Sequence, residues 1–339
     1  MRRLRRLFPR IYLLTGSLMP NGREDLWAQY YLVDGGERLG RSENAFHQRW
    51  FTKEVKDGLV TYGLRDGAAE EIDRIISDVT LVLKDKQPPV PKNLIRLDLS
   101  KAEQSAYSKM ARTSVLEFGE QKITAVNAGV LWGKLLQIAN GAVYDAEKNW
   151  HVVHNKKIEG LLELLESLPR PVIVGYGFVH DVERIRAALA ASKCGRVGIL
   201  LTNKSLDEWK AGNLDIGIMH PASAGHGLND LYISGAENLV WFGLTANREF
   251  YDQLNGRLAG GHRRTGRNVR IHHLICNNTI DEYAWDLLEF KDDDQKTAQT
   301  RVAEYAQRLK EQICNPRKVD SIQTGLRRQA PIASLDRAA

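Results

Sequence analysis

The sequence predicts an α/β protein built on a doubly wound parallel sheet. From Pro171 onward, short apolar runs alternate with amphipathic segments, and most runs are continuous in Val, Ile and Leu. Continuous runs are typical of parallel strands that helices cover on both faces, whereas half-exposed strands alternate apolar and polar residues. Repetition of strand and helix favours a doubly wound layer. The expected strands are 171–177, 196–202, 214–220, 238–243 and 269–276.

The amphipathic segments between these runs predict the helices of the layer. The expected helices are 180–191, 205–211, 248–259 and 279–291. In such sheets, ligands bind beyond the carboxyl ends of the strands. We expect the stretch "HPASAGHGLND" (220–230) and the arginines that follow residue 260 to lie at that edge.

The first 90 residues have a different pattern. "RIYLLTGS" (10–17) resembles one buried strand ending in a polar turn, and the expected helices are 23–33 and 68–83. One parallel strand without neighbours would leave its backbone groups unpaired. The region is therefore expected to be the end of a domain whose beginning is absent.

A proline-rich linker, "KDKQPPVPKN" (84–93), separates this region from the rest. The run "LIRLDLS" follows it, and the next expected helices are 101–118 and about 124–140. Ser100 precedes the first of these helices, with Glu103 three residues later, which predicts a capping box.

Composition sets limits on the class of protein. The net charge is +6 and the pI about 9.1, which permits a nucleic-acid or phosphate partner without requiring one. Three widely separated cysteines indicate reduced thiols, and no apolar run is long enough to span a membrane. These features predict a soluble cytoplasmic protein. The tryptophans expected in the core are Trp27, Trp132, Trp209, Trp241 and Trp285.

Positive charge is concentrated in "YDQLNGRLAGGHRRTGR" (251–267). Gln253 and Arg257 are four residues apart, so they share one face of a helix. Gly260 and Gly261 are expected to break that helix, and no Asp or Glu occurs between Gln253 and Ile280. A solvated basic surface is the alternative interpretation of this stretch.

Six stretches resemble, in family order, the motifs of Swi/Snf-type helicase-like ATPases of helicase superfamily two, particularly the short phage-type members. The stretches are "LLTGSLMPNGREDLW" (13–27), "VPKNLIRLDLSKAEQSAYSKM" (90–110), "LLQIANG" (135–141), "KKIEGLLELLES" with "PVIVGYGFVHDVERI" (156–185), "MHPASAGHGLND" (219–230) and "YDQLNGRLAGGHRR" (251–264). The resemblance covers roughly residues 10 to 291.

This resemblance implies a RecA-like doubly wound sheet, the second helicase lobe, with a mostly helical amino-terminal remnant of the first lobe. It divides the chain into the end of the first lobe with a helical insertion and linker (1–92), the second lobe (93–291), and a charged helix with a disordered tail (292–339). Neither a G-x-x-x-x-G-K-[ST] loop nor an Asp-Glu pair after a suitable strand is present. The chain is thus expected to be the carboxyl half of a motor.

The resemblance also implies roles for individual residues. Arg257 corresponds to an arginine finger, with Gln253 on the same face. The family usually has a second arginine where this chain has Gly260, and Arg263 or Arg264 would take its place. The implied nucleotide-binding residues are Gly225, Gly227 and Asn229, and the implied DNA-binding or coupling residues are Thr15, Ser17, Ser223 and Arg264.

ATP and Mg²⁺ are the implied cofactors, shared with a first lobe, and no metal site of the chain's own is expected. The implied partners are DNA and a separate polypeptide that carries the first lobe, in a bacterial host cytoplasm if the protein is encoded by a phage. The chain alone is then expected to be an inactive half of an ATP-hydrolysing helicase or translocase. Two alternatives stay open: a non-catalytic DNA-binding or regulatory RecA-like module, and the product of a split or mis-started gene.

Overall fold

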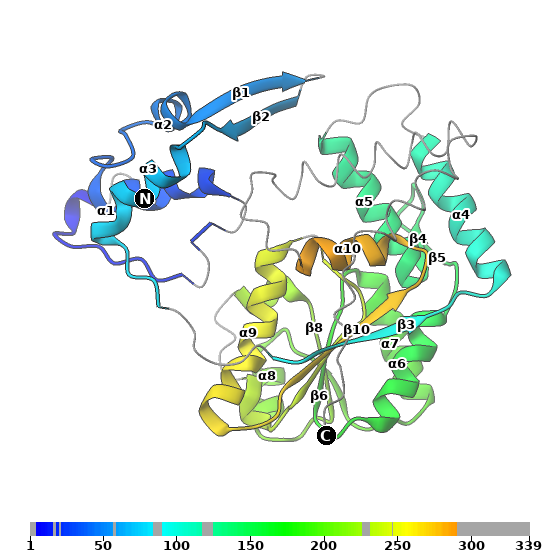
Figure 1. Ribbon diagram of the computed structural model, residues 1–339. Coiled ribbons are helices and arrows are strands. Elements are labelled where there is room, and N and C mark those ends of the chain that lie inside the picture. The colour runs from blue at the N-terminus through cyan, green and yellow to red at the C-terminus, as the bar shows by residue number, and fades with distance from the viewer. Residues whose placement is uncertain are drawn as a thin grey trace, which may run out of the picture.

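The computed structural model describes residues 5–15, 18–19, 22–56, 59–83, 90–116, 125–225, 231–245 and 247–289. A parallel six-stranded sheet with order β3-β10-β9-β6-β8-β7 forms its larger part (Figure 1). The strands are β3 (Lys92–Leu97), β6 (Val172–Gly175), β7 (Val197–Ile199), β8 (Ile216–Met219), β9 (Asn238–Trp241) and β10 (Arg270–Cys276). The predicted doubly wound parallel layer is confirmed, with every expected strand from residue 171 onward present.

Helices cover both faces of this sheet. They are α4 (Lys101–Leu116), α5 (Ala125–Asn140), α6 (Lys156–Ser167), α7 (Val179–Ala191), α8 (Asn203–Lys210), α9 (Arg248–Thr265) and α10 (Ile280–Glu289). A short antiparallel hairpin, β4 (Ala142–Tyr144) with β5 (Trp150–Val152), connects α5 to α6, and 3₁₀ turns η4 (Pro221–Gly225) and η5 (Leu231–Ser234) connect β8 to β9.

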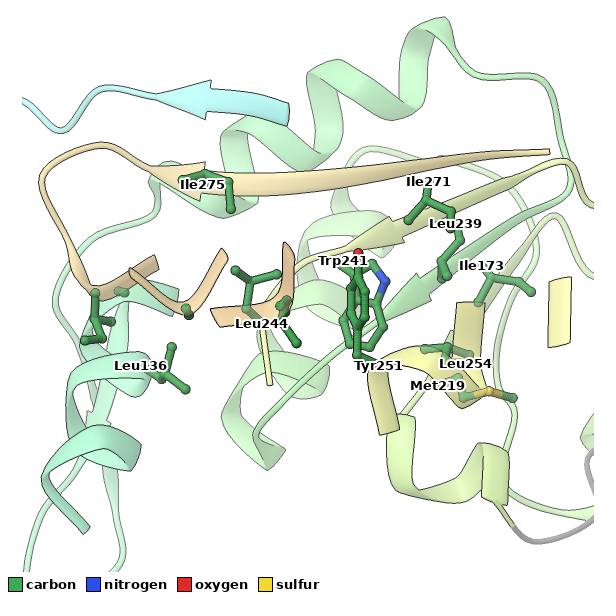
Figure 2. Packing of buried hydrophobic residues seen from close by; sticks show 14 of the residues in the cluster. Leu136, Ile173, Met219, Leu239, Trp241, Leu244, Tyr251, Leu254, Ile271 and Ile275 are labelled. Atoms are coloured by element: carbon green, nitrogen blue, oxygen red, sulfur yellow. The ribbon is translucent and has the colours of Figure 1, made fainter. Parts of the chain in front are cut away.

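Alternate residues of each strand face opposite sides of the sheet, so each strand contributes to two cores. Ile173, Leu239, Trp241 and Ile271 belong to the core under α4, α5, α8, α9 and α10, where Figure 2 shows them beside Tyr251 of α9. Residues that alternate with them, among them Val172, Val174, Val240 and Phe242, belong to the opposite core, under α6 and α7. Burial on both faces explains the continuous apolar runs in the sequence.

The amino-terminal part forms a third core of its own. Its elements are η1 (Arg5–Leu7), η2 (Arg23–Asp25), α1 (Leu26–Asp34), α2 (Glu43–Trp50), the antiparallel pair β1 (Phe51–Lys56) and β2 (Leu59–Leu64), α3 (Ala68–Ile76) and η3 (Ser77–Val79). Leu26, Phe46, Trp50 and Ile72 are fully or almost fully buried among them. The predicted helical character of this region is confirmed. We refer to residues 22–79 as the amino-terminal unit.

The expected buried strand at 10–17 is not formed by the described residues 10–15. They belong to no strand, and the Leu14 side chain is 97% exposed. Residues 16 and 17 lie outside the described residues. The sequence pattern identified an apolar run correctly, but no other described strand pairs with it, so the run stays on the surface.

Two other local predictions have clear outcomes. The capping box is confirmed, because the Ser100 backbone N–H donates to Glu103 Oε2 at 2.8 Å and the Glu103 N–H donates to Ser100 Oγ at 3.3 Å. Of the tryptophans expected in the core, Trp27 is buried in the amino-terminal core. Trp132, Trp209 and Trp241 are buried in the core that α9 covers, and Trp285 is partly buried against it. No helix within the described residues is both long enough and apolar enough to cross a membrane.

The predicted helix break at Gly260 and Gly261 is wrong, because α9 continues through both to Thr265. Two helical glycines cost about 1 kcal/mol each relative to alanine, but burial of Leu254, Leu258 and Ala259 on the same helix offsets that cost. The helix ends before Gly266, whose φ of 68° is the left-handed conformation common after helix ends.

Gly260 lies inside the helix and Gly266 directly after it, so alanine is expected to have opposite effects on stability at these two positions. A Cβ at Gly260 meets no atom within 4 Å, so Gly260→Ala is expected to raise the free energy of unfolding by about 0.5–1 kcal/mol. Gly266→Ala is expected to lower it by about 1 kcal/mol, because alanine is strained at positive φ. Urea-induced unfolding measures both, and the same sign of change in the two variants would contradict the assignment of the helix end.

Candidate functional site

The candidate site is one face of α9 with the turn beside it. Glu249, Gln253 and Arg257 follow each other at four-residue spacing and are all half-buried, and we call them the α9 stripe. Gln253 Nε2 donates to Glu249 Oε1 at 2.9 Å. This hydrogen bond holds Gln253 in line with the helix axis. The stripe brings together the two α9 residues that the sequence identified.

Two buried hydrogen bonds set how α9 is rotated on the sheet. Tyr251 Oη and His273 Nε2 of β10 are 2.9 Å apart, and Trp241 Nε1 of β9 donates to Asn255 Oδ1 at 2.9 Å. All four residues are buried. Because buried polar groups are costly to leave unpaired, a rotation of α9 that broke these bonds would be unfavourable. The α9 stripe is therefore held facing away from the sheet.

The turn that follows β8 packs against α9. Helix α9 contacts both η4 and η5, and Met219, Leu231 and Leu254 share one core on the same face of the sheet. Ser223 and Gly225 lie in η4, and the Ser223 backbone N–H donates to the His220 carbonyl at 3.0 Å. The sequence placed "HPASAG" directly after a strand, and this position is confirmed. The structure thus brings Ser223 and Gly225 to the element beside α9.

The arginines after residue 260 do not lie at the carboxyl edge of the sheet, so that expectation is wrong. Helix α9 runs antiparallel to the strands, and its 18 residues span about 27 Å. The helix carries the chain from the end of β9 back to the start of β10. Arg270 is the first residue of β10, and Arg267 Nη1 donates to the Tyr232 carbonyl at 3.0 Å.

The remaining predicted site residues are placed as follows. Arg263 and Arg264 lie in the last turn of α9, and only their backbone is described. Thr15 is exposed and belongs to no helix or strand. Gly227, Asn229 and Ser17 lie outside the described residues.

At the carboxyl edge of the central strands the structure has a buried polar network, which the sequence did not indicate. Lys157 Nζ and Asp281 Oδ2 are 2.7 Å apart, and both side chains are fully buried. Lys157 Nζ also donates to Asn140 Oδ1 at 2.8 Å, and Asn140 Nδ2 donates to Asp181 Oδ2 at 2.8 Å. These four residues come from α5, α6, α7 and α10, so the network joins four helices.

Backbone groups extend the network. Asp181 Oδ2 accepts from the N–H groups of Gly177 and Phe178 after β6, and Asp281 Oδ2 accepts from the Cys276 N–H at the end of β10. Arg184 donates to the carbonyls of Asn140 and His154 at 2.7 Å each. These bonds offset the cost of taking charges out of water. The edge of the sheet where ligands often bind is thus occupied by the chain's own side chains.

The network could not be found by spacing, because its members are separated by up to 141 positions, from Asn140 to Asp281. One signal was available: Lys157 is the second residue of α6, whose buried residues also include Ile158 and Leu161. A lysine on the apolar face of a helix implies a buried acidic partner. Within the described residues, no three His, Cys, Asp or Glu side chains gather as metal ligands.

Beside the network, His151 is exposed but His154, three residues later, is buried. Its side chain is 4% exposed, its Nε2 lies 3.0 Å from the Ile138 carbonyl, and burial lowers its pKa from 6.5 to about 4. Burial also lowers the pKa of His273 to about 3. Both histidines are therefore neutral in the folded protein at neutral pH.

These pKa values predict loss of stability in mild acid. Below pH 6.5 the unfolded chain protonates these histidines while the folded chain does not, so acid favours unfolding down to about pH 4 for His154 and 3 for His273. Between pH 7 and pH 5 we expect roughly 1–2 kcal/mol less stability per histidine. Urea unfolding at both pH values should show a smaller difference in His154→Gln than in His151→Gln, and equal differences would contradict the prediction.

The fold and the α9 stripe define a doubly wound α/β protein of the RecA-like class, with a polar helix face beside the turn after β8. No protein-family model matches the chain. The chain is 37% identical over 284 residues to protein p41 of Acyrthosiphon pisum secondary endosymbiont phage 1. The match covers 79% of this chain and 60% of p41, so the chain spans less than two thirds of that relative's length.

Solved structures similar to this chain include parts of ATPase domains. The C-terminal part of the Fun30 ATPase domain has a TM-score of 0.47 and 14% identity, covering 68% of this chain and 98% of that one. The Sulfolobus solfataricus SWI2/SNF2 ATPase core, in complex with double-stranded DNA, has a TM-score of 0.44 and 19% identity, covering 82% of this chain and 60% of that one.

Proposed function

We propose that the chain is the second-lobe half of an ATP-dependent DNA helicase or translocase. One observation carries the proposal: α9, with Gln253 and Arg257 on its outer stripe, packs against the turn after β8 on one face of the sheet. A motor of this kind needs its arginine finger and its glycine-rich turn on the same side. Had Arg257 and η4 lain on opposite faces, the proposal would fail.

We assign to Arg257 the role of stabilising the transition state of ATP hydrolysis. Its guanidinium would reach a phosphate held by a first lobe, where it stabilises charge that develops as the phosphoryl group transfers. Gln253 lies one turn earlier on the same stripe and is held by Glu249. The family resemblance implies nucleotide contact for Gly225, Gly227 and Asn229. It implies DNA contact or coupling for Thr15, Ser17, Ser223 and Arg264.

In this proposal, the chain contributes only one part of an ATP-binding site. ATP supplies the phosphoanhydride bond whose hydrolysis drives the motor. Among the described residues no acidic cluster is suited to Mg²⁺, and the sequence has no phosphate-binding G-x-x-x-x-G-K-[ST] loop. In the proposal, a first lobe on a separate polypeptide holds the nucleotide and Mg²⁺, and this chain contributes the arginine.

The experiment that tests the proposal is complementation. The purified chain alone should neither bind ATP tightly nor hydrolyse it. Mixed with a polypeptide that carries the Gly-Lys-Thr loop of a first lobe, it should restore ATP hydrolysis that DNA stimulates. DNA affinity should fall steeply with salt, because phosphate contacts release counterions. ATP hydrolysis by the chain alone would reject the proposal that a separate first lobe must supply the rest of the ATP site.

A second function, a non-catalytic DNA-binding or regulatory module, is favoured by one observation. Gly260 lies three residues after Arg257 in the same continuous helix, where the family resemblance implies another arginine. No side chain projects from that point of α9. This module would bind DNA, but a supplied first lobe would not restore ATP hydrolysis. A neighbouring reading frame that encodes the Gly-Lys-Thr loop would favour the motor instead.

A further inference from the structure

Positive charge gathers where the chain enters the strands of the six-stranded sheet. The loops that precede β6, β7, β8, β9 and β10 are 168–171, 192–196, 211–215, 235–237 and 266–269. Because the strands are parallel, these loops and the first residues of the strands share one edge, the amino edge of the sheet. The cations of the loops, together with the first residue of β10, are Arg170, Lys193, Arg196, Arg267 and Arg270, and the acids are Asp215 and Glu237. We call the five cations the amino-edge surface.

The loops at the opposite edge of the sheet carry no lysine or arginine. The segments that follow the strands are 98–100, 176–178, 200–202, 220–225, 242–245 and 277–279. Their single ionised side chain at neutral pH is that of Asp98. The two edges therefore differ in charge, and the positive loops are the ones that face away from the turn after β8.

The cations of the amino-edge surface are accessible. Lys193, Arg196 and Arg270 are exposed, and Arg170 and Arg267 are half-buried. Neither Lys193 nor Arg270 forms an ion pair with another residue in the part of the chain that the structure describes. Arg267 Nη1 donates to the uncharged Tyr232 carbonyl at 3.0 Å, which fixes the position of its guanidinium group.

Two of the arginines share one acid. Arg196 Nε and Nη2 donate to Oδ2 and Oδ1 of Asp215 at 3.1 and 3.0 Å. Hydrogen bonds from Arg196 lower the pKa of Asp215 below its ordinary value, and the nearby charge of Arg170 lowers it further. One carboxylate therefore balances two neighbouring guanidinium groups, so this part of the surface keeps a net positive charge.

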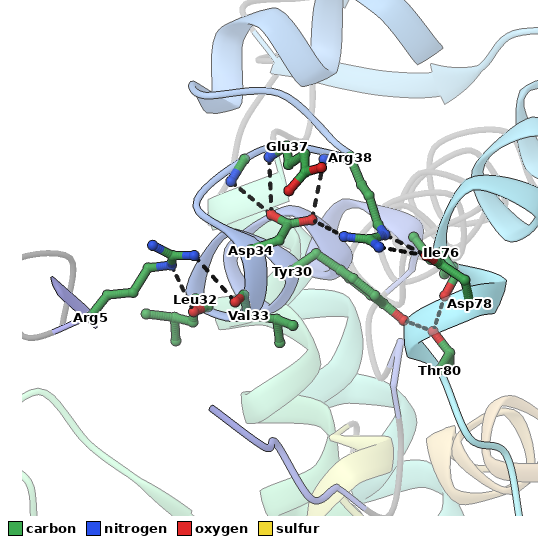
Figure 3. Close-up of polar contacts among 11 residues, drawn as sticks. Arg5, Tyr30, Leu32, Val33, Asp34, Glu37, Arg38, Ile76, Asp78 and Thr80 are labelled. Atoms are coloured by element: carbon green, nitrogen blue, oxygen red, sulfur yellow. Dashed lines mark hydrogen bonds and ion pairs between the residues drawn. The ribbon is translucent and has the colours of Figure 1, made fainter. Parts of the chain in front are cut away.

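The amino-terminal unit handles its arginines differently. Arg38 contacts the carboxylates of both Asp34 and Asp78, at 3.1 and 2.6 Å (Figure 3). Arg49 contacts Glu71 at 2.7 Å. A phosphate ligand would have to displace a carboxylate from each of these arginines. The amino-edge surface is thus the better placed of the two groups of cations to bind an external anion.

We propose that the amino-edge surface binds the phosphate backbone of duplex nucleic acid. The inference goes beyond the proposed function, which involves none of these five residues. It adds a second nucleic-acid contact, at the edge of the sheet opposite to Ser223 and Gly225.

The spacing of the cations favours a polyanion over a small anion. In the strand order β10-β9-β6-β8-β7, Arg270, Arg170 and Arg196 lie at the starts of every second strand. Neighbouring strands are about 4.8 Å apart, so these positions are about 10 Å apart and the row is about 20 Å long. A single phosphate cannot reach from one to the next. A duplex carries one charge per about 1.7 Å of its axis, so it offers phosphates along the whole row.

The composition of the loops favours a duplex over other polyanions. They contain no aromatic residue, whereas proteins bind single-stranded nucleic acid largely by stacking bases on aromatic side chains. None of the large exposed apolar side chains of the described residues belongs to these loops, whereas a protein interface has an apolar centre. Phosphate contacts carry no sequence information, so we expect binding that is independent of base sequence.

The test measures the affinity of the full chain for a fluorescently labelled DNA duplex of random sequence, by anisotropy at several salt concentrations. Lys193→Gln with Arg270→Gln should weaken the affinity at about 0.1 M salt by about tenfold or more. It should also reduce the slope of log affinity against log salt concentration by about two, one for each lost phosphate contact. Because both side chains are exposed, the variant should keep the urea unfolding transition of the unmodified chain.

Lys101→Gln with Lys204→Gln is the matched control. It removes the same charge from two exposed lysines in the first turns of α4 and α8, at the carboxyl edge. The control should change the affinity by less than about twofold, since salt screens charges that lie beyond about 10 Å. Absence of duplex binding, or an effect of the control that equals or exceeds that of Lys193→Gln with Arg270→Gln, would overturn the inference.

Two competitors test the class of ligand. An unlabelled single strand and poly-glutamate should each displace the labelled duplex less effectively than unlabelled duplex does. Stronger displacement by the single strand would overturn the assignment to a duplex. Displacement by poly-glutamate as effective as that by duplex would identify a surface for acidic proteins and would also overturn the inference.

The binding experiment contains neither ATP nor a first lobe, so it is independent of the motor. Duplex binding that depends on Lys193 and Arg270, without ATP hydrolysis in the complementation experiment, would reject the motor and keep the amino-edge surface. DNA-stimulated ATP hydrolysis, with duplex binding that Lys193→Gln with Arg270→Gln leaves unchanged, would reject the surface and keep the motor.

Discussion

Replacing Arg257 by alanine is expected to lower the DNA-stimulated ATP hydrolysis rate of the complemented motor by about 10³-fold or more. The reason is that a guanidinium aimed at a transferring phosphoryl group stabilises charge that is present mainly in the transition state. The loss should therefore appear in kcat, with little change in KM. Steady-state hydrolysis of the mixture with a first-lobe polypeptide, with and without DNA, measures the effect.

The continuous helix supplies a control within the same stretch. Position 264 is seven residues, or two helical turns, after Arg257 and shares its face, whereas position 263 is turned away by more than 90°. If an arginine replaces the side chain missing at Gly260, Arg264→Ala should lower kcat more than Arg263→Ala does. Equal hydrolysis rates in Arg257→Ala and the unmodified chain would rule out the arginine-finger role.

Replacing Lys157 by methionine is expected to cost about 3–5 kcal/mol of the free energy of unfolding. The substitution keeps the volume of the side chain but leaves the Asp281 carboxylate buried without its cation. It also removes the donor to Asn140 Oδ1. Urea-induced unfolding of the full chain measures the loss as a lower transition midpoint.

Lys156 provides the matched comparison, because it is the adjacent lysine and its side chain is 32% exposed. Lys156→Met should cost less than about 1 kcal/mol, as for other surface ion pairs. Adding Asp281→Asn to Lys157→Met removes the buried charge while keeping an acceptor for the Cys276 N–H, so it should restore more than half of the loss. Equal effects of Lys156→Met and Lys157→Met would show that the buried pair is not stabilising the helices that it joins.

The sequence predicted the strands and helices of the sheet because each signal is local. A strand buried on both faces needs a continuous apolar run, and the Ser100 capping box needs two residues three positions apart. The apolar run at 10–15 led to a wrong strand prediction because its signal is also local. An apolar run indicates that its residues are suited to burial, but it does not show that a neighbouring strand exists within the described chain. The glycines at 260 and 261 misled because packing of the α9 core face outweighs local helix propensity.

The candidate site was predictable only in part. Gln253 and Arg257 share a face by helical spacing alone, and the structure confirms that both lie on one stripe. The position of the arginines after residue 260 depends on the direction of α9 relative to the strands, which a linear pattern does not contain. The Lys157 network depends on four helices meeting at one edge, so it emerges only in three dimensions.

Strand β3 has a mechanical consequence. Among the described strands it lies at the edge of the sheet, next to β10, and its residues pair with residues 271–276. The amino-terminal unit precedes β3 in the chain, so tension applied to that unit reaches the sheet first through the β3–β10 ladder. During synthesis, that ladder closes only after residue 276 has emerged. Among the ladders of the described sheet, the β3–β10 ladder is thus the last that can be completed during synthesis and the first that such tension would load.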